Sequence, residues 1–298
     1  MRVARTAVAT HPGRKRRHNE DAYVCEPPLF AIADGMGGAR AGEVASGLAA
    51  AALQENEVNG TGAERVVALM QQANRSVYER ASRDADVAGM GTTMTVALVE
   101  NGGVVFGHVG DSRAYVLRDG ELEQLTDDHS LVAELVRGGK LSAEEAEHHP
   151  QRSVITRALG TDPDVDVDTF TVAGHDGDVF VLCSDGLTDM VADDEIGAVL
   201  SERRASLEEA ANELVRRANK AGGQDNITVV AFELTDEPDE RTLEHTVDHT
   251  VEQPAVAAQA AATPEPKERS GFRRYLPLLI LLLAIVVAAA VLWVLVQR

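Results

Sequence analysis

The stretch GVVFGHVGDSRAYVLRDGEL, residues 103–122, carries the pattern that decides the fold class. It is rich in β-branched and aromatic residues on both sides of a short Gly-Asp-Ser segment, which is typical of two successive strands. The pair Asp119-Gly120 then separates two apolar runs, and this pair favours a type I′ turn. Residues 118–122 therefore predict a β-hairpin, and the whole stretch predicts antiparallel strands.

The same composition recurs in other short runs that are bounded by Gly, Asp or Asn. These runs are YVCEPPLFAIAD (23–34), TTMTVALVE (92–100), DVFVLCSD (178–185) and ITVVAFEL (227–234). Other segments place apolar residues at helical spacing, namely 42–55, 63–84, 130–138, 192–203 and 207–221. Because the strands cluster as meanders with long helices between the clusters, we predict an α+β fold. Two antiparallel sheets layered with helices fit better than a doubly wound parallel sheet.

The charge balance argues against one class of partner. The 298 residues include 28 Lys and Arg against 48 Asp and Glu, a formal net charge of −20, so no nucleic acid held through its phosphates is expected. Cys25 and Cys183 lie far apart without Cys or His at zinc-ligand spacing, which argues against a disulfide framework and a zinc knuckle. The first residues lack the apolar core of a signal peptide. This composition favours a reduced, cytoplasmic catalytic region.

Residues 276–296 differ sharply in composition from the rest of the chain. They contain no charged side chain and exceed the roughly 20 residues that a helix needs to cross a bilayer. A buried core helix is the alternative, but no amphipathic pattern supports it, so we predict a transmembrane helix. Four cations precede this segment and one follows it: Lys267, Arg269, Arg273, Arg274 and Arg298. The positive-inside rule then predicts a single-pass cell-membrane protein whose catalytic domain is cytoplasmic.

The segment before the apolar stretch predicts a linker. Residues 236–270 are acidic at first and then rich in Ala and Pro, with few large apolar side chains, which is typical of a disordered tether. The predicted organisation is therefore a globular domain over residues 1–235, a disordered linker over 236–270 and a transmembrane helix over 276–296.

The run FAIADGMGG, residues 30–38, leads an apolar strand into a carboxylate followed by glycines. Asp-Gly is common turn chemistry, so one interpretation is a strand that has reached its turn. The other interpretation is that Asp34 holds a ligand at the mouth of a sheet, where glycine lets the backbone approach closely. One motif does not choose between them.

Further carboxylates stand at strand boundaries. Asp111 and Asp185 follow apolar runs, Asp225 precedes one, and Glu20 and Asp21 precede another. Strand ends lie at sheet edges, so we expect these side chains to converge. Convergent carboxylates repel unless cations neutralise them, and an oxygen-only ligand set favours Mg²⁺ or Mn²⁺ over zinc. Two such ions would generate hydroxide and clamp a phosphoryl oxygen, which predicts hydrolytic phosphoryl chemistry.

Seven motifs in order resemble those of the PP2C (PPM) family of metal-dependent Ser/Thr protein phosphatases, bacterial branch. The motifs are RRHNED, ADGMGG, GTTMTV, GHVGDSRAYVLRDGELEQLTDDHS, HPQRSVITRALG, CSDGLTD and GGQDNITVV, and the resemblance covers about Arg5 to Leu234. The resemblance implies a β-sandwich of two antiparallel sheets flanked by helices, in the order α-β-β-α. It also implies a protein-serine/threonine phosphatase that uses two core Mn²⁺ or Mg²⁺ ions and a third, weaker one.

The resemblance assigns metal-binding roles to matching residues. Asp34 resembles the catalytic carboxylate that bridges the two core metals, with the carbonyl of Gly35 beside it. Asp185 and Asp225 resemble the other catalytic carboxylates around these ions. Asp111 resembles the ligand that supports the third metal together with Asp185.

Other matching residues are expected around the metals and the substrate. Four are expected to assist the ligands, mostly through water or by support: Glu20, Asp21, Asp189 and Asn226. Arg16, five residues before Asp21, matches the catalytic arginine that holds the substrate phosphate, and Arg17 is the neighbouring alternative. A planar guanidinium fork can bind two phosphate oxygens at once, which is the physical reason for an arginine there.

In the mechanism that the resemblance implies, a hydroxide bridging two metals attacks phosphorus in line, and no phosphoenzyme forms. The expected partners are phosphoproteins, including Ser/Thr kinases and their substrates, at or near the membrane. Many eukaryotic members carry a proton-donating His where this chain has Met36 and Gly37, so the general acid stays open and water is our hypothesis. Residues 127–160 should include the family's flap. A catalytically silent scaffold and an anchored signalling partner are the alternative functions, and the presence of all four metal carboxylates argues against the scaffold.

Overall fold

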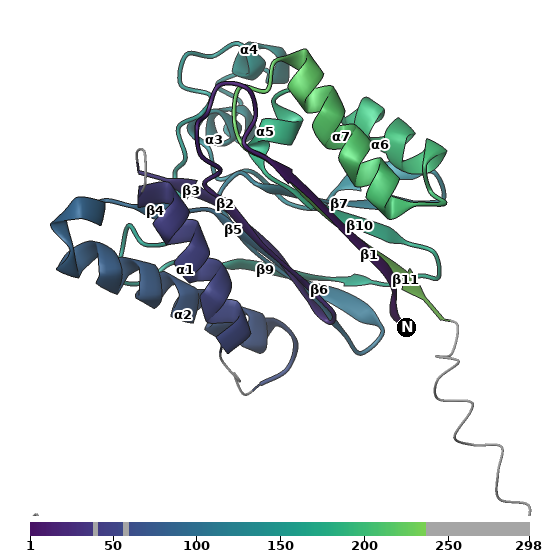
Figure 1. Cartoon of the computed structure of the whole chain (residues 1–298), viewed down its shortest axis with the longest axis horizontal. Helices are drawn as coiled ribbons and strands as arrows, with labels where there is room; N and C mark the ends of the chain where they lie inside the picture. The colour runs from purple at the N-terminus through teal and green to yellow at the C-terminus, as the bar shows by residue number, and fades with distance from the viewer. Residues whose placement is uncertain (38–40, 56–59, 237–298) are drawn as a thin grey trace, which may run out of the picture. The chain divides into compact units, whose positions relative to one another are not determined.

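A computed structural model of the chain describes residues 1–37, 41–55 and 60–236. Within these ranges two antiparallel sheets lie between two layers of helices (Figure 1). The first sheet has the order β1 (Arg2–His11), β11 (Ile227–Thr235), β10 (Val179–Cys183), β7 (Arg113–Arg118) and β8 (Glu121–Gln124). The second has the order β2 (Asp21–Glu26), β3 (Leu29–Met36), β5 (Met94–Glu100), β6 (Gly103–Val109) and β9 (Asp168–Ala173), and β4 (Gly91–Thr92) pairs with β3.

Helices cover the outer face of each sheet. The second sheet is covered by α1 (Ala41–Glu55) and α2 (Gly62–Arg83), which is followed by the short 3₁₀ helix η1 (Ala85–Val87). The first sheet is covered by α5 (Asp185–Thr188), α6 (Asp193–Glu202) and α7 (Leu207–Ala221). The remaining helices, α3 (Leu131–Arg137) and α4 (Ala143–Glu147), belong to the segment between β8 and β9. The predicted α-β-β-α layering is confirmed.

Strand alternation builds separate apolar layers. In β3, Phe30 and Ile32 point into the core between the sheets, whereas Ala31 and Ala33 pack in the core beneath α1 and α2. The Phe30 ring stacks on that of Phe232 from β11, with ring centroids 4.1 Å apart. The alanines on the other face leave room for a helix to lie close to the strand. Because both faces of β3 are buried, its sequence is apolar from Leu29 to Ala33 instead of alternating.

Most predicted elements are confirmed, and the missed ones have two causes. The five predicted helices correspond to α1, α2, α3, α6 and α7 with ends shifted by at most one residue. The sequence did not reveal β1 and β9, which are edge strands that bury little of their surface and so carry polar residues. It also missed α4 and α5, with five and four residues, because such short helices show no apolar period.

The stretch 103–122 folds as predicted locally but not as a single meander. Its hairpin is present, with Asp119 at φ 52° and Gly120 at φ 87° between paired residues Arg118 and Glu121. However, β6 belongs to the second sheet and β7 to the first. The chain therefore crosses from one sheet to the other at residues 110–112, which brings Asp111 to one end of the sandwich.

The run 30–38 also differs from a simple strand end. β3 continues past Asp34, because Gly35 and Met36 pair with Thr92 and Gly91 of β4. The interpretation that the strand has reached its turn at this Asp-Gly pair is therefore wrong. Asp34 lies within a strand, opposite Asp21 of β2.

The C-terminal predictions concern residues that the structure does not describe. The described part ends one residue after β11, so the linker after Asp236 and the apolar segment 276–296 lie outside it. Within the described ranges, no helix has both the length and the apolar character that a membrane span requires.

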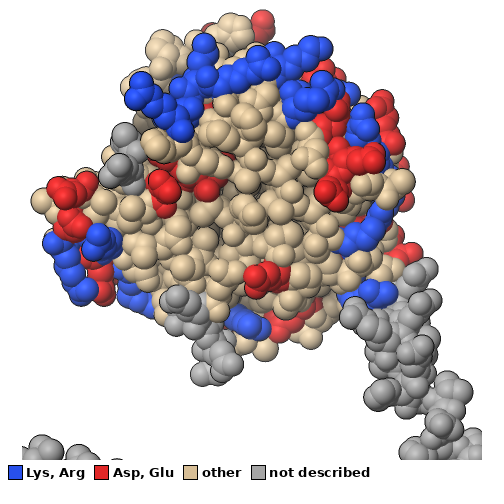
Figure 2. Space-filling view, viewed as in Figure 1, with Lys and Arg blue, Asp and Glu red and all other residues tan. Residues whose placement is uncertain are grey.

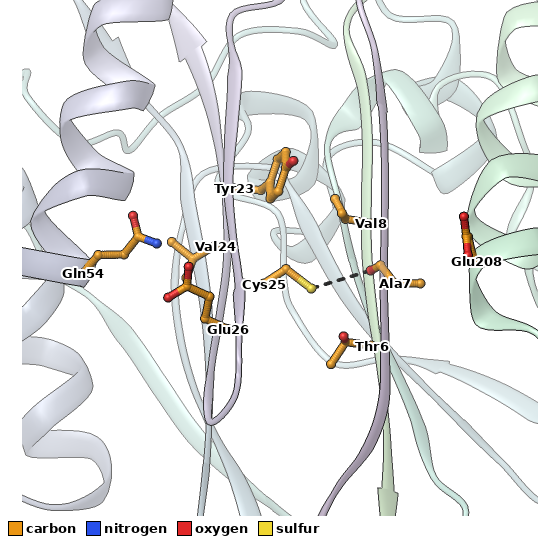
Figure 3. A pocket seen from close by; sticks show the side chains of 9 residues that line it. All are labelled: Thr6, Ala7, Val8, Tyr23, Val24, Cys25, Glu26, Gln54 and Glu208. Carbon is orange, nitrogen blue, oxygen red and sulfur yellow. Dashed lines mark hydrogen bonds between the residues drawn. The ribbon is translucent and has the colours of Figure 1, made fainter.

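The edge strands β1 and β2 face each other across a groove of about 490 Å³ (Figure 3). Its wall includes Gln54 of α1 on one side and Glu208 of α7 on the other. Across it, the Sγ of Cys25 donates to the carbonyl oxygen of Ala7 at 3.8 Å. None of the candidate metal or catalytic residues lines this groove, so it is separate from the site described next.

Candidate active site

Five carboxylates, here called the carboxylate cluster, come from both sheets. They are Asp21, Asp34, Asp111, Asp185 and Asp225. Asp21 and Asp34 are paired across β2 and β3, and Asp111 follows β6. Asp185 begins α5 and is separated from β10 by Ser184, and Asp225 is separated from β11 by Asn226. The β-sandwich thus gathers side chains that lie far apart in the sequence.

Burial and mutual repulsion both disfavour negative charge on the carboxylate cluster. Burial raises the pKa of Asp34 well above its usual range, and the other four carboxylates of the cluster raise it further. Burial likewise raises the pKa of Asp185, with Asp111 and Asp225 as the largest repelling neighbours. Burial also raises the pKa values of Asp21 and Asp111 to about 6. When no cation is bound, the surroundings of these four carboxylates disfavour their ionised forms.

The donor atoms fit a hard divalent cation. The Asp21 Oδ2 atom accepts hydrogen bonds from Thr228 Oγ1 at 2.6 Å and Ser184 Oγ at 3.0 Å, but its Oδ1 atom is buried without a partner. The Oδ1 atom of Asp185 is also buried without a partner. Buried carboxylate oxygens seldom stay unsatisfied, and a cation would satisfy them. Among the described residues, no group of three or more His, Cys, Asp or Glu side chains has the arrangement of a metal site.

Gly35 packs where no other residue fits. Its N–H donates to the carbonyl oxygen of Glu20 at 3.2 Å. A Cβ atom on Gly35 would overlap the carbonyl oxygen of Gly42 in the first turn of α1 and would lie 2.6 Å from the Glu20 oxygen. The backbones of the loop before β2, strand β3 and helix α1 therefore approach one another closely beside Asp34.

Arg16 forms an ion pair with Asp225, a member of the carboxylate cluster. Its Nη2 atom donates to Asp225 Oδ2 at 2.6 Å, and this bond raises the pKa of the guanidinium. Asn226 holds the loop that carries Arg16, because its Nδ2 donates to the carbonyl oxygens of Pro12 at 3.0 Å and His18 at 2.9 Å. Its Oδ1 accepts from the N–H of Glu20 at 2.7 Å. The predicted support residue Asn226 thus positions two other site residues.

Asp189 lies at the rim of a large pocket. This pocket, of about 800 Å³, is also lined by Asp111, Asp185 and residues of α3 and α4, within the predicted flap. The Asp189 Oδ2 atom lies 3.4 Å from the Arg152 guanidinium of that segment. The structure therefore places Asp189 between the cluster and the flap, at the surface.

Several hydroxyl groups support the cluster and were not found by sequence reasoning. Thr93 Oγ1 accepts from the N–H of Asp34 at 3.0 Å and shares a hydrogen bond with Ser112 Oγ at 2.9 Å. Ser184 and Thr228 bind Asp21 as described above. Three of the four stand within two residues of a predicted carboxylate or motif glycine, but nothing in the sequence distinguishes them from ordinary strand residues.

Two histidines near the site, His108 and His129, are buried. His108 is 1% exposed, and its ring contacts Thr95 Oγ1 at 2.9 Å and the carbonyl oxygen of Asp127 at 3.1 Å. The His129 Nδ1 atom accepts from the N–H of Gly110 at 3.0 Å. Neither ring is placed to donate a proton to a substrate at the surface.

The buried His108 ring is expected to make stability depend on pH. Burial lowers its pKa from 6.5 to about 4, so between these values the unfolded state binds the proton and the folded state does not. The free energy of unfolding should therefore fall by about 2 kcal/mol from this group between pH 7.5 and 5. Urea unfolding of wild type and His108→Gln at both pH values measures it. An equal fall in both proteins would contradict this assignment.

Comparison with known proteins agrees with the fold and the site. The Protein phosphatase 2C family matches residues 14–229. The Serine/threonine phosphatase stp of Listeria welshimeri is 43% identical over 236 residues, which cover 75% of this chain and 93% of that protein. The crystal structure of the Mycobacterium tuberculosis serine/threonine phosphatase PstP/Ppp superimposes with a TM-score of 0.73 at 40% identity, covering 78% of this chain and 98% of that one.

A second solved structure contains metal. It is the catalytic domain of the serine threonine protein phosphatase PstP in complex with two manganese ions, with a TM-score of 0.73 and 38% identity, covering 79% of this chain and 100% of that one. Family match, sequence identity and fold coincide over the same part of the chain. This protein belongs to the protein phosphatase 2C family.

Proposed function

We propose that this protein hydrolyses phosphoserine and phosphothreonine esters of proteins with two Mn²⁺ or Mg²⁺ ions. Asp34, Asp185, Asp225 and the carbonyl of Gly35 would hold these two ions, and Asp111 would help to hold a third. The observation that carries the proposal is the cluster of half-buried carboxylates beside the Arg16 guanidinium, with two buried oxygens that have no hydrogen-bond partner. When bound, the ions lower the pKa of water and neutralise phosphoryl oxygens.

The chain's own groups bind and orient the phosphate. Arg16 uses one nitrogen on Asp225 and so has other N–H groups of its fork for phosphate oxygens. The hydrogen bonds of Asn226 hold the loop that carries Arg16, and also Glu20, in place beside the cluster. Because His108 and His129 are buried, we assign protonation of the leaving Ser or Thr oxygen to water.

The full chain should release phosphate from a phosphothreonine peptide only when Mn²⁺ or Mg²⁺ is present. Arg16→Ala should lower kcat/KM by about 10–100-fold, the range expected for a charge-assisted bidentate contact, and Arg16→Lys should recover part of it. Arg75→Ala, an exposed cation on α2, is the control and should match wild type. A wild type that binds metal and phosphopeptide without releasing phosphate would favour the scaffold function.

We further propose that residues 276–296 anchor the protein in the cell membrane with residues 1–235 in the cytoplasm. The support is the uncharged apolar sequence and the excess of cations before it. Anchoring would raise the local concentration of the enzyme near membrane Ser/Thr kinases and their substrates, which it would oppose. The full chain should stay in the membrane pellet after a carbonate wash, whereas a chain ending at Ser270 should not. Release of both by the wash would exclude the anchor.

A further inference from the structure

The loop after β1 carries four consecutive exposed cations. We call residues 12–18 the basic loop, and its cations are Arg14, Lys15, Arg16 and Arg17. Figure 2 shows Lys and Arg gathered along the top of the molecule, where Figure 1 shows this loop and the C-terminal end of α7. This concentration of positive charge occurs in a chain with a formal net charge of −20. The basic loop is therefore positively charged, whereas the protein as a whole is negatively charged.

The basic loop is held firmly beside the site. The N–H groups of Arg14 and Lys15 donate to the carbonyl oxygen of Gly223 at 2.7 and 3.2 Å. Gly13 packs against the backbone of Asp225, so closely that a Cβ atom on it would overlap the Asp225 carbonyl oxygen. Asn226 holds both ends of the loop through Pro12 and His18. The loop cations thus have a defined place next to Asp225 before any ligand binds.

Three of the four cations are available for a ligand. Within the described residues, Arg14, Lys15 and Arg17 make no ion pair, and Arg16 pairs only with Asp225. Many other arginines of the described fold are already paired, including Arg5, Arg80, Arg83, Arg113, Arg118 and Arg157. An anion that binds the basic loop would therefore replace no existing ion pair except the one at Arg16.

We propose that Arg14, Lys15 and Arg17 bind acidic or phosphorylated side chains that flank the target phosphoserine or phosphothreonine of the substrate protein. This inference rests on the proposed function, because it takes Arg16 as the contact of the reacting phosphate. The basic loop forms a turn at residues 13–15 and a bend at 17–18, so its cations are concentrated in a short stretch. An extended substrate advances only about 3.3–3.6 Å per residue, so several of its successive side chains can lie beside this stretch. The net charge of −20 disfavours nucleic acid as the ligand.

Peptide substrates that differ only in their flanks test this proposal. Phosphothreonine peptides with Glu, Gln, Lys or a second phosphothreonine at the flanking positions are compared by kcat/KM with the full chain in neutral detergent and Mn²⁺. Wild type should prefer the anionic peptides over the Gln peptide by about tenfold at low salt, the sum of three exposed ion pairs. The preference should shrink at high salt, because exposed charges are screened.

A matched pair of variants locates the preference. The triple variant Arg14→Ser/Lys15→Ser/Arg17→Ser should reduce the anionic preference to about twofold or less. The triple variant Arg75→Ser/Arg80→Ser/Arg83→Ser removes the same charge from α2, on the other sheet, and should keep the tenfold preference. If only the Glu peptide or only the doubly phosphorylated peptide is preferred, the loop binds that source of negative charge.

Two results would overturn the inference. They are equal rates for anionic and Gln peptides in wild type, and a preference that survives in the loop variant. Absence of hydrolysis for every peptide would instead count against the proposed function. In that case fluorescence anisotropy of the labelled peptides still reports whether the loop variant binds the anionic ones more weakly than the α2 variant does.

Discussion

The Asp185→Asn variant is expected to lose at least about 1,000-fold in metal-dependent phosphate release. The change removes one ligand charge from the carboxylate cluster while leaving the shape of the side chain almost unchanged. A loss of this size corresponds to about 4 kcal/mol of transition-state stabilisation, which is the range that a catalytic metal supplies. Phosphate release at saturating Mn²⁺ measures it.

The same variant should also respond differently to pH in its metal-free form. The folded pKa of Asp185 is raised by burial and by its neighbours, so the unfolded chain loses this proton at lower pH than the folded one. Between the two pKa values the folded state binds more protons, and the free energy of unfolding therefore falls as pH rises. Asparagine does not ionise, so this fall should be smaller in Asp185→Asn than in wild type.

The two readouts separate a lost ligand from a damaged fold. Asp119→Asn, at the exposed tip of the β7–β8 hairpin, changes the same charge and should keep both wild-type activity and the wild-type pH dependence. Mn²⁺ should raise the melting temperature of wild type and of this control much more than that of Asp185→Asn, because binding stabilises only a folded state that holds the ion. Full activity in Asp185→Asn would show that Asp185 is not a metal ligand.

The Gly35→Ala variant is expected to be destabilised by about 3 kcal/mol or more and to lose most of its activity. One methyl group would overlap the carbonyl oxygen of Gly42 and crowd that of Glu20, and both are backbone atoms that move only with their elements. Either α1 or the loop before β2 must shift, and the shift occurs beside Asp34. Urea unfolding and phosphate release measure the two effects.

Gly47→Ala is the matched control for this change. Gly47 lies in the middle of α1, and a Cβ atom there would meet no other atom within 4 Å. Alanine is the better helix former, so this variant should gain about 0.5–1 kcal/mol in stability and keep its activity. Equal stabilities for the two variants would show that the close approach at Gly35 imposes no constraint.

The sequence by itself determined the local structure and the chemistry of the candidate site. Helical spacing, β-branched runs and the Asp119-Gly120 turn depend on neighbours in the chain, and these predictions agree with the described fold. The order of the motifs along the chain is enough to place Asp34, Asp185 and Asp225 in one family pattern. Edge strands such as β1 were missed because they bury too little surface to require an apolar pattern.

Only the tertiary structure decided how these parts meet. It divided β6 and β7 between two sheets, although three residues separate them. It paired Arg16 with Asp225 and gave Asp21 its hydroxyl partners, Ser184 and Thr228. Each of these contacts joins residues more than 160 positions apart. The Asp21 contacts depend on the packing of the two sheets against each other, and the Arg16 contact depends on the pairing of β1 with β11. No local pattern of residues encodes either.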